Sequence, residues 1–335
     1  MKRLAVILLA ITMISCNKEV AQLPNPFFES WETPYGVPPF SSIKDYHYQP
    51  AFERAMALHN EEIDAIVNCK EEPTFENTIA AMDRSGRMLS DVSNVFGMIC
   101  AAETNDTLQQ LESQIMPQLA AHSDAILMNE ALFARVKAVY DTRNSCDLEA
   151  DQIRLTEKIY DDFVRSGALL DSQKKARLME INEELSALSV RFGSNVLAEN
   201  NNFVMYQTDK EVATLPTSVK DAARLKAKEL GEEGKYAFTL HKPSMIPFLT
   251  FSPERAAREQ IYRAYINRCN NNNEYDNKAI ISDMVRLRTE KAHLLGYNSY
   301  ADYSISEQMA AKPKAVYALL DEVWEPALER AKEEL

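Results

Sequence analysis

The stretch KYAFTLHKPSMIPFLTFSPERAAREQIYRAYINRCNNNNEYDNKAIISDMVRLRTEKAHLLGYNSYADY, residues 235–303, shows most clearly how this chain is organised. It begins with two short runs typical of strands, 236–240 and 247–251, on either side of a proline-containing connector. A helix should then begin at Ser252, whose side chain can cap the first turn. Pro253 follows at the position where a missing amide hydrogen costs nothing.

Two helices with clear ends are predicted in this stretch. The first presents an apolar stripe and stops at an asparagine-rich loop, 270–273. The second ends at Gly296, where a glycine adopts a positive φ without strain. The two stripes are Ala257, Ile261, Ala264 and Tyr265, and then Ile280, Met284, Leu287 and Leu294.

The start of the chain has the pattern of a secretory signal. Residues 1–15 hold Lys2 and Arg3 followed by a short apolar run, too short for a permanent membrane span. Cys16 follows a small residue, as in a bacterial lipoprotein box, and is the predicted lipidation site. Ordinary secretion, with Cys16 incidental, is the alternative. The body would then be soluble, extracytoplasmic and periplasmic, attached to a bacterial membrane by acyl chains alone.

Residues 16–50 are predicted to be the anchor and an extended segment rich in proline and aromatic residues. The proline density argues against helix, and the aromatic rings favour packing along the body over a free tether. A proline-rich ligand for a partner protein is the alternative.

Residues 51–199 are predicted to form an N-terminal helical domain. Apolar residues recur at helical spacing through several segments, with Thr74 as one cap. The longest helix should begin at Asp171 and bury a broad face. The residues of that face are Leu178, Ile181, Leu185, Leu188, Phe192 and Val196.

Residues 200–252 are predicted to form a small antiparallel β element with one helix, 217–230. Its strands would be 202–207 and the two runs described above. Residues 253–335 continue as helices. The last helix should be kinked at Pro326 and shows no stop signal, so we expect this portion to be truncated. The predicted fold class is mainly α.

The sequence also resembles a known family. PFLTFSPERAAREQIYRAY, NNNNEYDN and LRTEKAHLLGYNSYADYS are similar to segments of the thimet oligopeptidase family of zinc metallopeptidases, most of all its bacterial peptidyl-dipeptidase branch. The likeness extends to PTFENT at 73–78, AAHSDAI at 120–126 and residues 31–43. It implies the N-terminal half of a multi-helical zincin-type metallopeptidase. In that family, two halves enclose a deep channel that admits short peptides, and C-terminal dipeptides are removed.

The family's zinc motif is absent from this sequence. The motif His-Glu-x-x-His supplies two zinc ligands one helical turn apart and a glutamate that activates water. No two of the five histidines are four residues apart; they are His47, His59, His122, His241 and His293. We therefore assign no catalytic, cofactor-binding or metal residue here, and we expect this chain to bind no zinc and to be inactive alone.

Other constellations are weaker. Glu290 and His293 form a Glu-x-x-His half-motif without the second copy that a di-metal site needs, so a packed or capping His293 is favoured. His122 and Asp124 are two residues apart and cannot share a helix face. Four cysteines besides Cys16 lack Cys-x-x-Cys spacing and are expected to be single thiols: Cys69, Cys100, Cys146 and Cys269.

The charge and composition of the chain limit which partners it can bind. The net charge of −13 disfavours nucleic acid, and 46% hydrophobic residues with 8 glycines indicate an ordered helical protein. The function implied by the resemblance is a zinc-dependent peptidyl-dipeptidase acting on short peptides, monomeric at full length. The alternative is a non-catalytic helical lipoprotein that binds peptides or a partner protein.

Overall fold

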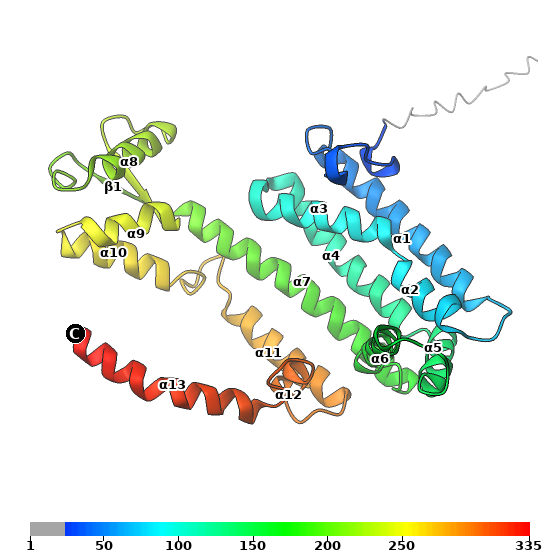
Figure 1. Cartoon of the computed structure of the whole chain (residues 1–335). Helices are drawn as coiled ribbons and strands as arrows, with labels where there is room; N and C mark the ends of the chain where they lie inside the picture. Colours follow the sequence, from blue (N-terminus) through cyan, green and yellow to red (C-terminus); the bar gives the residue numbers. More distant parts are fainter. Residues whose placement is uncertain (1–23) are drawn as a thin grey trace, which may run out of the picture.

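One long helix, α7 (Ser172–Asn202), connects the two ends of the molecule in the computed structural model, which describes residues 24–335 (Figure 1). The predicted signal and Cys16 lie outside these residues. Asp171 caps α7, since its Oδ1 accepts the Lys174 amide at 2.9 Å. Leu178 and Ile181 are fully buried, whereas the apolar residues further along the predicted face are half-buried. The face is therefore covered completely only near its N-terminal end.

Helices before α7 form an N-terminal layer with two apolar cores. Edge-to-face packing of Phe52 on Phe96 (5.4 Å between centroids) lies in the first core, and stacking of Phe133 on Phe163 (5.6 Å) in the second. The predicted fold class, mainly α, is confirmed. The helices of this layer are α1 (Asp45–Val67), α2 (Ala81–Arg84), α3 (Arg87–Glu103), α4 (Asp106–Leu127), α5 (Glu130–Thr142) and α6 (Ala150–Arg165).

Two details of the layer differ from the sequence prediction. The aromatic segment packs against the body as expected, with Phe27 buried and short helical turns at Pro26–Phe28 and Pro34–Gly36. Helix α1 nevertheless begins at Asp45 and includes Pro50. At the sixth helical residue a proline removes a single intrahelical hydrogen bond, which burial of the neighbouring Tyr48 and Phe52 offsets.

The helix predicted from Thr74 onward is interrupted. A π-helical turn, Phe75–Ala80, leads into α2, and the chain then turns at Ser85 and Gly86 before α3. Thr74 is the expected cap: its hydroxyl accepts the Asn77 amide at 3.2 Å. Gly86 has φ 68, a left-handed conformation that ends one helix and starts the next.

Beyond α7 lies a small two-stranded antiparallel sheet. β1 (Val204–Gln207) pairs with β2 (Tyr236–Thr239), with Val204 opposite Thr239. Three helices surround it: α8 (Thr217–Glu229), α9 (Lys242–Phe251) and α10 (Arg255–Ile266). Ile261, the centre of the predicted α10 stripe, is fully buried against this unit.

The prediction of a third strand at 247–251 is wrong, because these residues form the second half of α9. A short apolar run fits a buried helix as well as a strand, and Pro243 at the start of α9 favours the helix. Ser252 therefore ends α9 instead of capping α10, although its Oγ accepts the Glu254 amide at 3.3 Å.

The chain then returns along α7. α11 (Lys278–Leu294) packs against α7 and ends, as predicted, just before Gly296, which has φ 85. α12 (Tyr300–Ile305) follows, and α13 (Pro313–Glu334) remains one helix through Pro326. Within residues 24–335, none of the helices is long and apolar enough to cross a membrane.

Candidate functional site

The helices after the sheet carry many exposed apolar side chains. We call these the apolar set, and each is about half or more exposed. Its members are Ile246 and Phe251 on α9, Tyr262 and Ile266 on α10, Ile281 and Val285 on α11, and Tyr317, Leu320, Val323 and Trp324 on α13. In Figure 1, α10, α11 and α13 lie on the same side of α7, away from the N-terminal layer.

α13 contributes most to the apolar set. None of its residues is buried, and Trp324 is 65% exposed, although its spacing of apolar residues is that of a helix that packs against a partner. Helices of this length draw most of their stability from packing. A concentration of exposed aromatic and aliphatic side chains marks a surface that binds another protein surface or a ligand.

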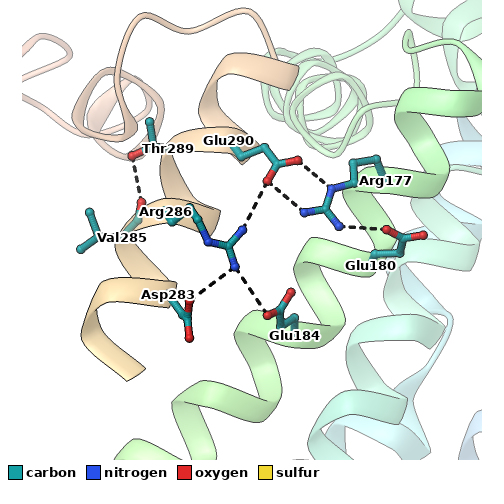
Figure 2. Close-up of polar contacts among 8 residues, drawn as sticks. All are labelled: Arg177, Glu180, Glu184, Asp283, Val285, Arg286, Thr289 and Glu290. Carbon is teal, nitrogen blue, oxygen red and sulfur yellow. Dashed lines mark hydrogen bonds and ion pairs between the residues drawn. The ribbon is translucent and has the colours of Figure 1, made fainter. Parts of the chain in front are cut away.

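The position of α11 on α7 is fixed by a ladder of ion pairs (Figure 2). Arg177 on α7 makes a two-pronged contact with Glu290 on α11, with Nε to Oε1 at 2.7 Å and Nη2 to Oε2 at 2.9 Å. Arg286 on α11 extends the ladder. Its Nη2 lies 3.8 Å from Oε1 of Glu184 on α7, and its Nη1 lies 3.9 Å from Oε2 of Glu290. The hydrogen bonds from Arg177 hold the pKa of Glu290 below its usual value.

A second, less exposed network lies beside the ladder. Lys291 Nζ on α11 donates to Asn182 Oδ1 on α7 at 2.7 Å. The Asn182 amide nitrogen is 2.9 Å from both carboxylate oxygens of Asp124 on α4. Burial is the main cause that lowers the pKa of Lys291 and raises that of Asp124. Three helices are thereby joined through one asparagine.

An arginine at the end of α6, Arg165, makes several contacts with α12 and the residues just after it. Arg165 Nη2 donates to the Tyr303 carbonyl at 3.1 Å, and its guanidinium carbon lies 4.7 Å from the centroid of the Tyr303 ring. The same guanidinium also contacts Ser306 and, at 3.3 Å, Glu307. These contacts link the N-terminal layer directly to the segment that precedes α13.

A pocket of about 550 Å³ lies between α8, β2 and α9. Its walls are mostly small and apolar, with Thr239, His241 and Lys226 at its polar edge. His241 Nδ1 lies 3.3 Å from the Thr239 hydroxyl. Sequence patterns do not indicate this pocket, because residues of β2 and of two helices form it together.

The candidate residues identified from the sequence do not come together in one site. Glu290 is committed to Arg177, while Nε2 of His293, on the exposed side of α11, lies 3.2 Å from the Asn298 carbonyl oxygen. His122 and Asp124 point to different partners, as expected for residues two apart on a helix. Cys69, Cys100, Cys146 and Cys269 are free thiols.

The described residues do not fit a zinc ion. From residue 24 to 335, no group of three or more histidine, cysteine, aspartate or glutamate side chains is arranged to hold a metal. A structural or catalytic zinc needs three or four such ligands. We therefore derive no chemical step through zinc from these residues.

Two contacts that sequence reasoning missed are long-range. His59 meets His122 across 63 positions, and Lys291 reaches Asn182 across 109. Each pair lies on different helices, and neither has a motif spacing. The only available signal was that both His122 and Asp124 fall within the AAHSDAI segment at 120–126.

Comparison with known proteins finds similarity to peptidases. The profile of Peptidase family M3 matches residues 248–335. The dipeptidyl carboxypeptidase of Escherichia coli is 36% identical over 312 residues, which are 93% of this chain and 46% of that protein. The dipeptidyl carboxypeptidase of Salmonella typhimurium is 36% identical over 311 residues, 92% of this chain and 46% of that protein.

Oligopeptidase A of Haemophilus influenzae is 32% identical over 309 residues, 90% of this chain and 44% of that protein. The chain thus spans about half the length of the curated relatives that it matches.

Proposed function

Since this chain is related in sequence to peptidase family M3, we propose that it forms part of a zinc-dependent metallopeptidase that removes dipeptides from the carboxyl ends of short peptides. The observation that carries the proposal is the similarity to two bacterial dipeptidyl carboxypeptidases across nearly the whole of this chain. The metal and the general base would come from sequence outside these 335 residues. Zinc would polarise the scissile carbonyl and the attacking water.

The role of this chain is then to position the catalytic portion. The ladder and the Lys291–Asn182–Asp124 network fix α11 on α7, and Arg165 fixes α12. The apolar set on α9, α10, α11 and α13 supplies a surface against which the remainder of the enzyme packs. Together these helices would form one wall of a peptide channel.

The chain is also proposed to act outside the cytoplasm, held at a membrane by acyl chains on Cys16. The basic and then apolar leader followed by Ser15 and Cys16 supports this location. Acyl chains anchor a protein by the hydrocarbon area that they bury, and two or more are needed for stable attachment.

A chimaera tests the catalytic proposal. Residues 24–335 of this chain would replace the matching 46% of the Escherichia coli dipeptidyl carboxypeptidase, and release of C-terminal dipeptides from short synthetic peptides would be measured with and without a zinc chelator. We expect chelator-sensitive dipeptide release from the chimaera and none from this chain alone. The matched control carries Leu287→Asp, which places a charge in the buried face of α11 and should abolish activity.

Two results would contradict the proposal. One is a folded chimaera, with a cooperative thermal transition, that releases no dipeptide. The other is chelator-sensitive hydrolysis by the 335-residue chain alone, which would mean that the catalytic groups lie within it. The mass of the native protein extracted from membranes tests the anchor, since acylation of Cys16 adds the mass of its acyl chains.

A further inference from the structure

Two histidines that the proposed peptidase chemistry does not use meet inside the N-terminal layer. Nε2 of His122 on α4 lies 3.0 Å from Nδ1 of His59 on α1, and the ring centroids are 5.0 Å apart. At this separation the rings meet nitrogen to nitrogen, with the N–H of one ring directed at the lone pair of the other. The contact requires one nitrogen to be a donor and the other an acceptor.

The neighbouring serine fixes which histidine is the acceptor. The Ser85 hydroxyl donates its one hydrogen to the Met82 carbonyl at 2.8 Å, so it can only accept from Nε2 of His59, 3.3 Å away. Neutral His59 therefore carries its hydrogen on Nε2 and presents a lone pair at Nδ1. That lone pair accepts the Nε2 hydrogen of His122.

The His59 ring has little freedom to escape this arrangement. Gly86, with φ 68, lies against it so closely that a Cβ at that position would be 2.8 Å from Cε1 of His59. The Gly86 amide is held in turn by Oε2 of Glu62 at 2.7 Å. The partly buried ring thus contacts α4 on one side and the turn between α2 and α3 on the other.

The charged groups around the pair are few. Glu62 on α1 is the nearby carboxylate and opposes the effect of burial on the pKa of His59, although burial dominates and lowers it. Burial and the neighbouring His59 lower the pKa of His122. On the turn, Arg84 pairs with Glu76, and on α4 Asp124 faces Asn182 of α7.

We propose that the contact between His59 and His122 is an acid-sensitive latch that holds α1 to α4 while at least one of the two imidazoles is neutral. A single added proton leaves the contact intact, because the charged ring still donates to the lone pair of the neutral one. Once both imidazoles are protonated, two N–H groups face each other, and the hydrogen bond is replaced by a repulsive contact. The latch then opens, and α1 and the α2–α3 turn loosen from α4. A chain exposed to the outside of a cell would experience such changes in pH.

The short distance between the two nitrogens also bears on why we propose a hydrogen bond between the histidines and not a shared metal ion. Two imidazoles that share a metal direct their lone pairs at a common point beside the line between them, at about 2.0–2.1 Å from each nitrogen. Here the two nitrogens lie 3.0 Å apart, within hydrogen-bond distance of each other. No third ligand completes a site within residues 24–335.

The direction of the pH effect follows from the lowered pKa values. Both imidazoles have an ordinary value of 6.5, and both are lowered in the folded chain. The unfolded chain therefore binds more protons than the folded chain when the pH falls below about 6.5. The stability that the latch provides is present above this pH and is lost as the pH falls through the folded values.

The experiment compares thermal unfolding of the whole chain at about pH 7.5 and about pH 5.5, together with nitrogen NMR of the labelled imidazoles. His59→Gln is the test variant, because a carboxamide can accept from His122 and donate to Ser85 without titrating. His293→Gln on the exposed side of α11 is the matched control. We expect Tm of the unmodified chain and of H293Q to fall by on the order of 2–4 °C more than that of H59Q.

The NMR titration decides the matter even if H59Q fails to fold. Two coupled steps, with the His59 Nε2–H tautomer at high pH, would support the latch. Independent titration of both imidazoles at the ordinary value would overturn it, as would equal falls in Tm for all three proteins. A shift of these two imidazole signals by added Zn²⁺ at about pH 7.5, ahead of the other histidines, would also overturn it in favour of a metal site.

Discussion

Replacement of Lys291 by methionine tests whether a buried polar network joins the two parts of the molecule. The substitution keeps an unbranched side chain of similar length and removes only the ammonium group. Asn182 then loses the donor at 2.7 Å from its Oδ1, while its nitrogen still contacts both oxygens of Asp124. The carboxylate, in a residue that is 7% exposed, is left without a nearby cation in this network.

The magnitude can be estimated from these contacts. A hydrogen bond to a charged group contributes about 1.5–3 kcal/mol, and loss of the partner of a buried charge raises the cost further. Two effects reduce the cost. Arg165 repels Lys291, and this repulsion disappears in the variant; Asp124 also keeps its two contacts to Asn182. We therefore expect a loss of about 2–3 kcal/mol, which lowers Tm by roughly 3–4 °C for a protein of this size.

The assay is thermal or urea unfolding at pH 7, with Lys278→Met as the matched control. Lys278 lies at the start of the same helix, with a side chain that is 51% exposed and an ion pair to Asp276 at 3.0 Å. An exposed pair of this kind contributes about 0–1 kcal/mol. The difference between the two lysine variants isolates the contribution of the network from a general effect of losing a positive charge on α11.

The pH dependence of the variant supplies a second readout. Burial raises the pKa of Asp124 above 3.8, and removal of the lysine should raise it further. Protonation of Asp124 relieves the unpaired charge, so the cost of K291M should shrink as the pH falls from 7 toward 3.8. The reasoning would be refuted if K291M and K278M unfold with the same free energy, or if Asp124→Asn leaves the cost of K291M unchanged.

Three further outcomes are expected. Glu290→Gln should lower Tm by roughly 1–2 °C at low salt, because Glu290 loses its ion pair with Arg177. The pair is partly exposed, so at 1 M salt, where the screening length is about 3 Å, Tm should not change. Equal effects at both salt concentrations would contradict this. Gly86→Ala should lower the free energy of urea unfolding by more than about 1 kcal/mol, because the residue has positive φ and no space for a Cβ. Gly97→Ala should instead stabilise α3 by about 0.5–1 kcal/mol, because no atom lies within 4 Å of the added methyl. Similar values for the two variants would be inconsistent with the structure. Leu320→Glu should reduce binding of a hydrophobic fluorescent dye with little change in Tm, because the side chain is 55% exposed in the apolar set; a large loss of stability would show that it is packed.

Local rules predicted most of the helices because their ends are set by neighbouring residues. Asp171 and Thr74 cap helices through side-chain contacts three residues away, and Gly296 follows α11 with positive φ. Such signals depend on short segments of chain, which the sequence presents directly. The same is true of the stripe around Ile261, whose spacing already defines one face of a helix.

Tertiary contacts decided the cases in which local rules failed. The run 247–251 is apolar enough for a strand, but Phe248 is fully buried within the core formed by β2, α8 and α10, and a helix fills that space. Pro50 is tolerated in α1 because its neighbours Tyr48 and Phe52 are buried in the first core of the N-terminal layer. Both outcomes depend on packing partners that are distant in sequence, such as Phe96, which packs on Tyr48 and Phe52.

The candidate site was less accessible to sequence reasoning than the fold. The family resemblance indicated similarity to peptidases, yet the groups that position α11 come from α4, α7 and α11 and share no spacing. Glu290 illustrates the difficulty: with His293 it has the spacing of a metal half-motif, but Arg177, 113 positions earlier, takes both of its oxygens. A motif assigns chemistry to a residue only if no partner elsewhere in the chain already uses its atoms.

The N-terminal layer and α13 differ in how much their stability depends on a packing partner. The two cores of the N-terminal layer are formed mainly by helices α1 to α6 and bury Tyr48, Phe52 and Phe163 completely. α11 contacts α7 through charged and amide groups and also buries Leu287, whereas α13 has no buried residue. Polar contacts fix orientation but supply less stability than apolar burial does. The N-terminal layer should therefore fold by its own apolar burial, whereas α13 should gain most of its stability from the surface that covers the apolar set.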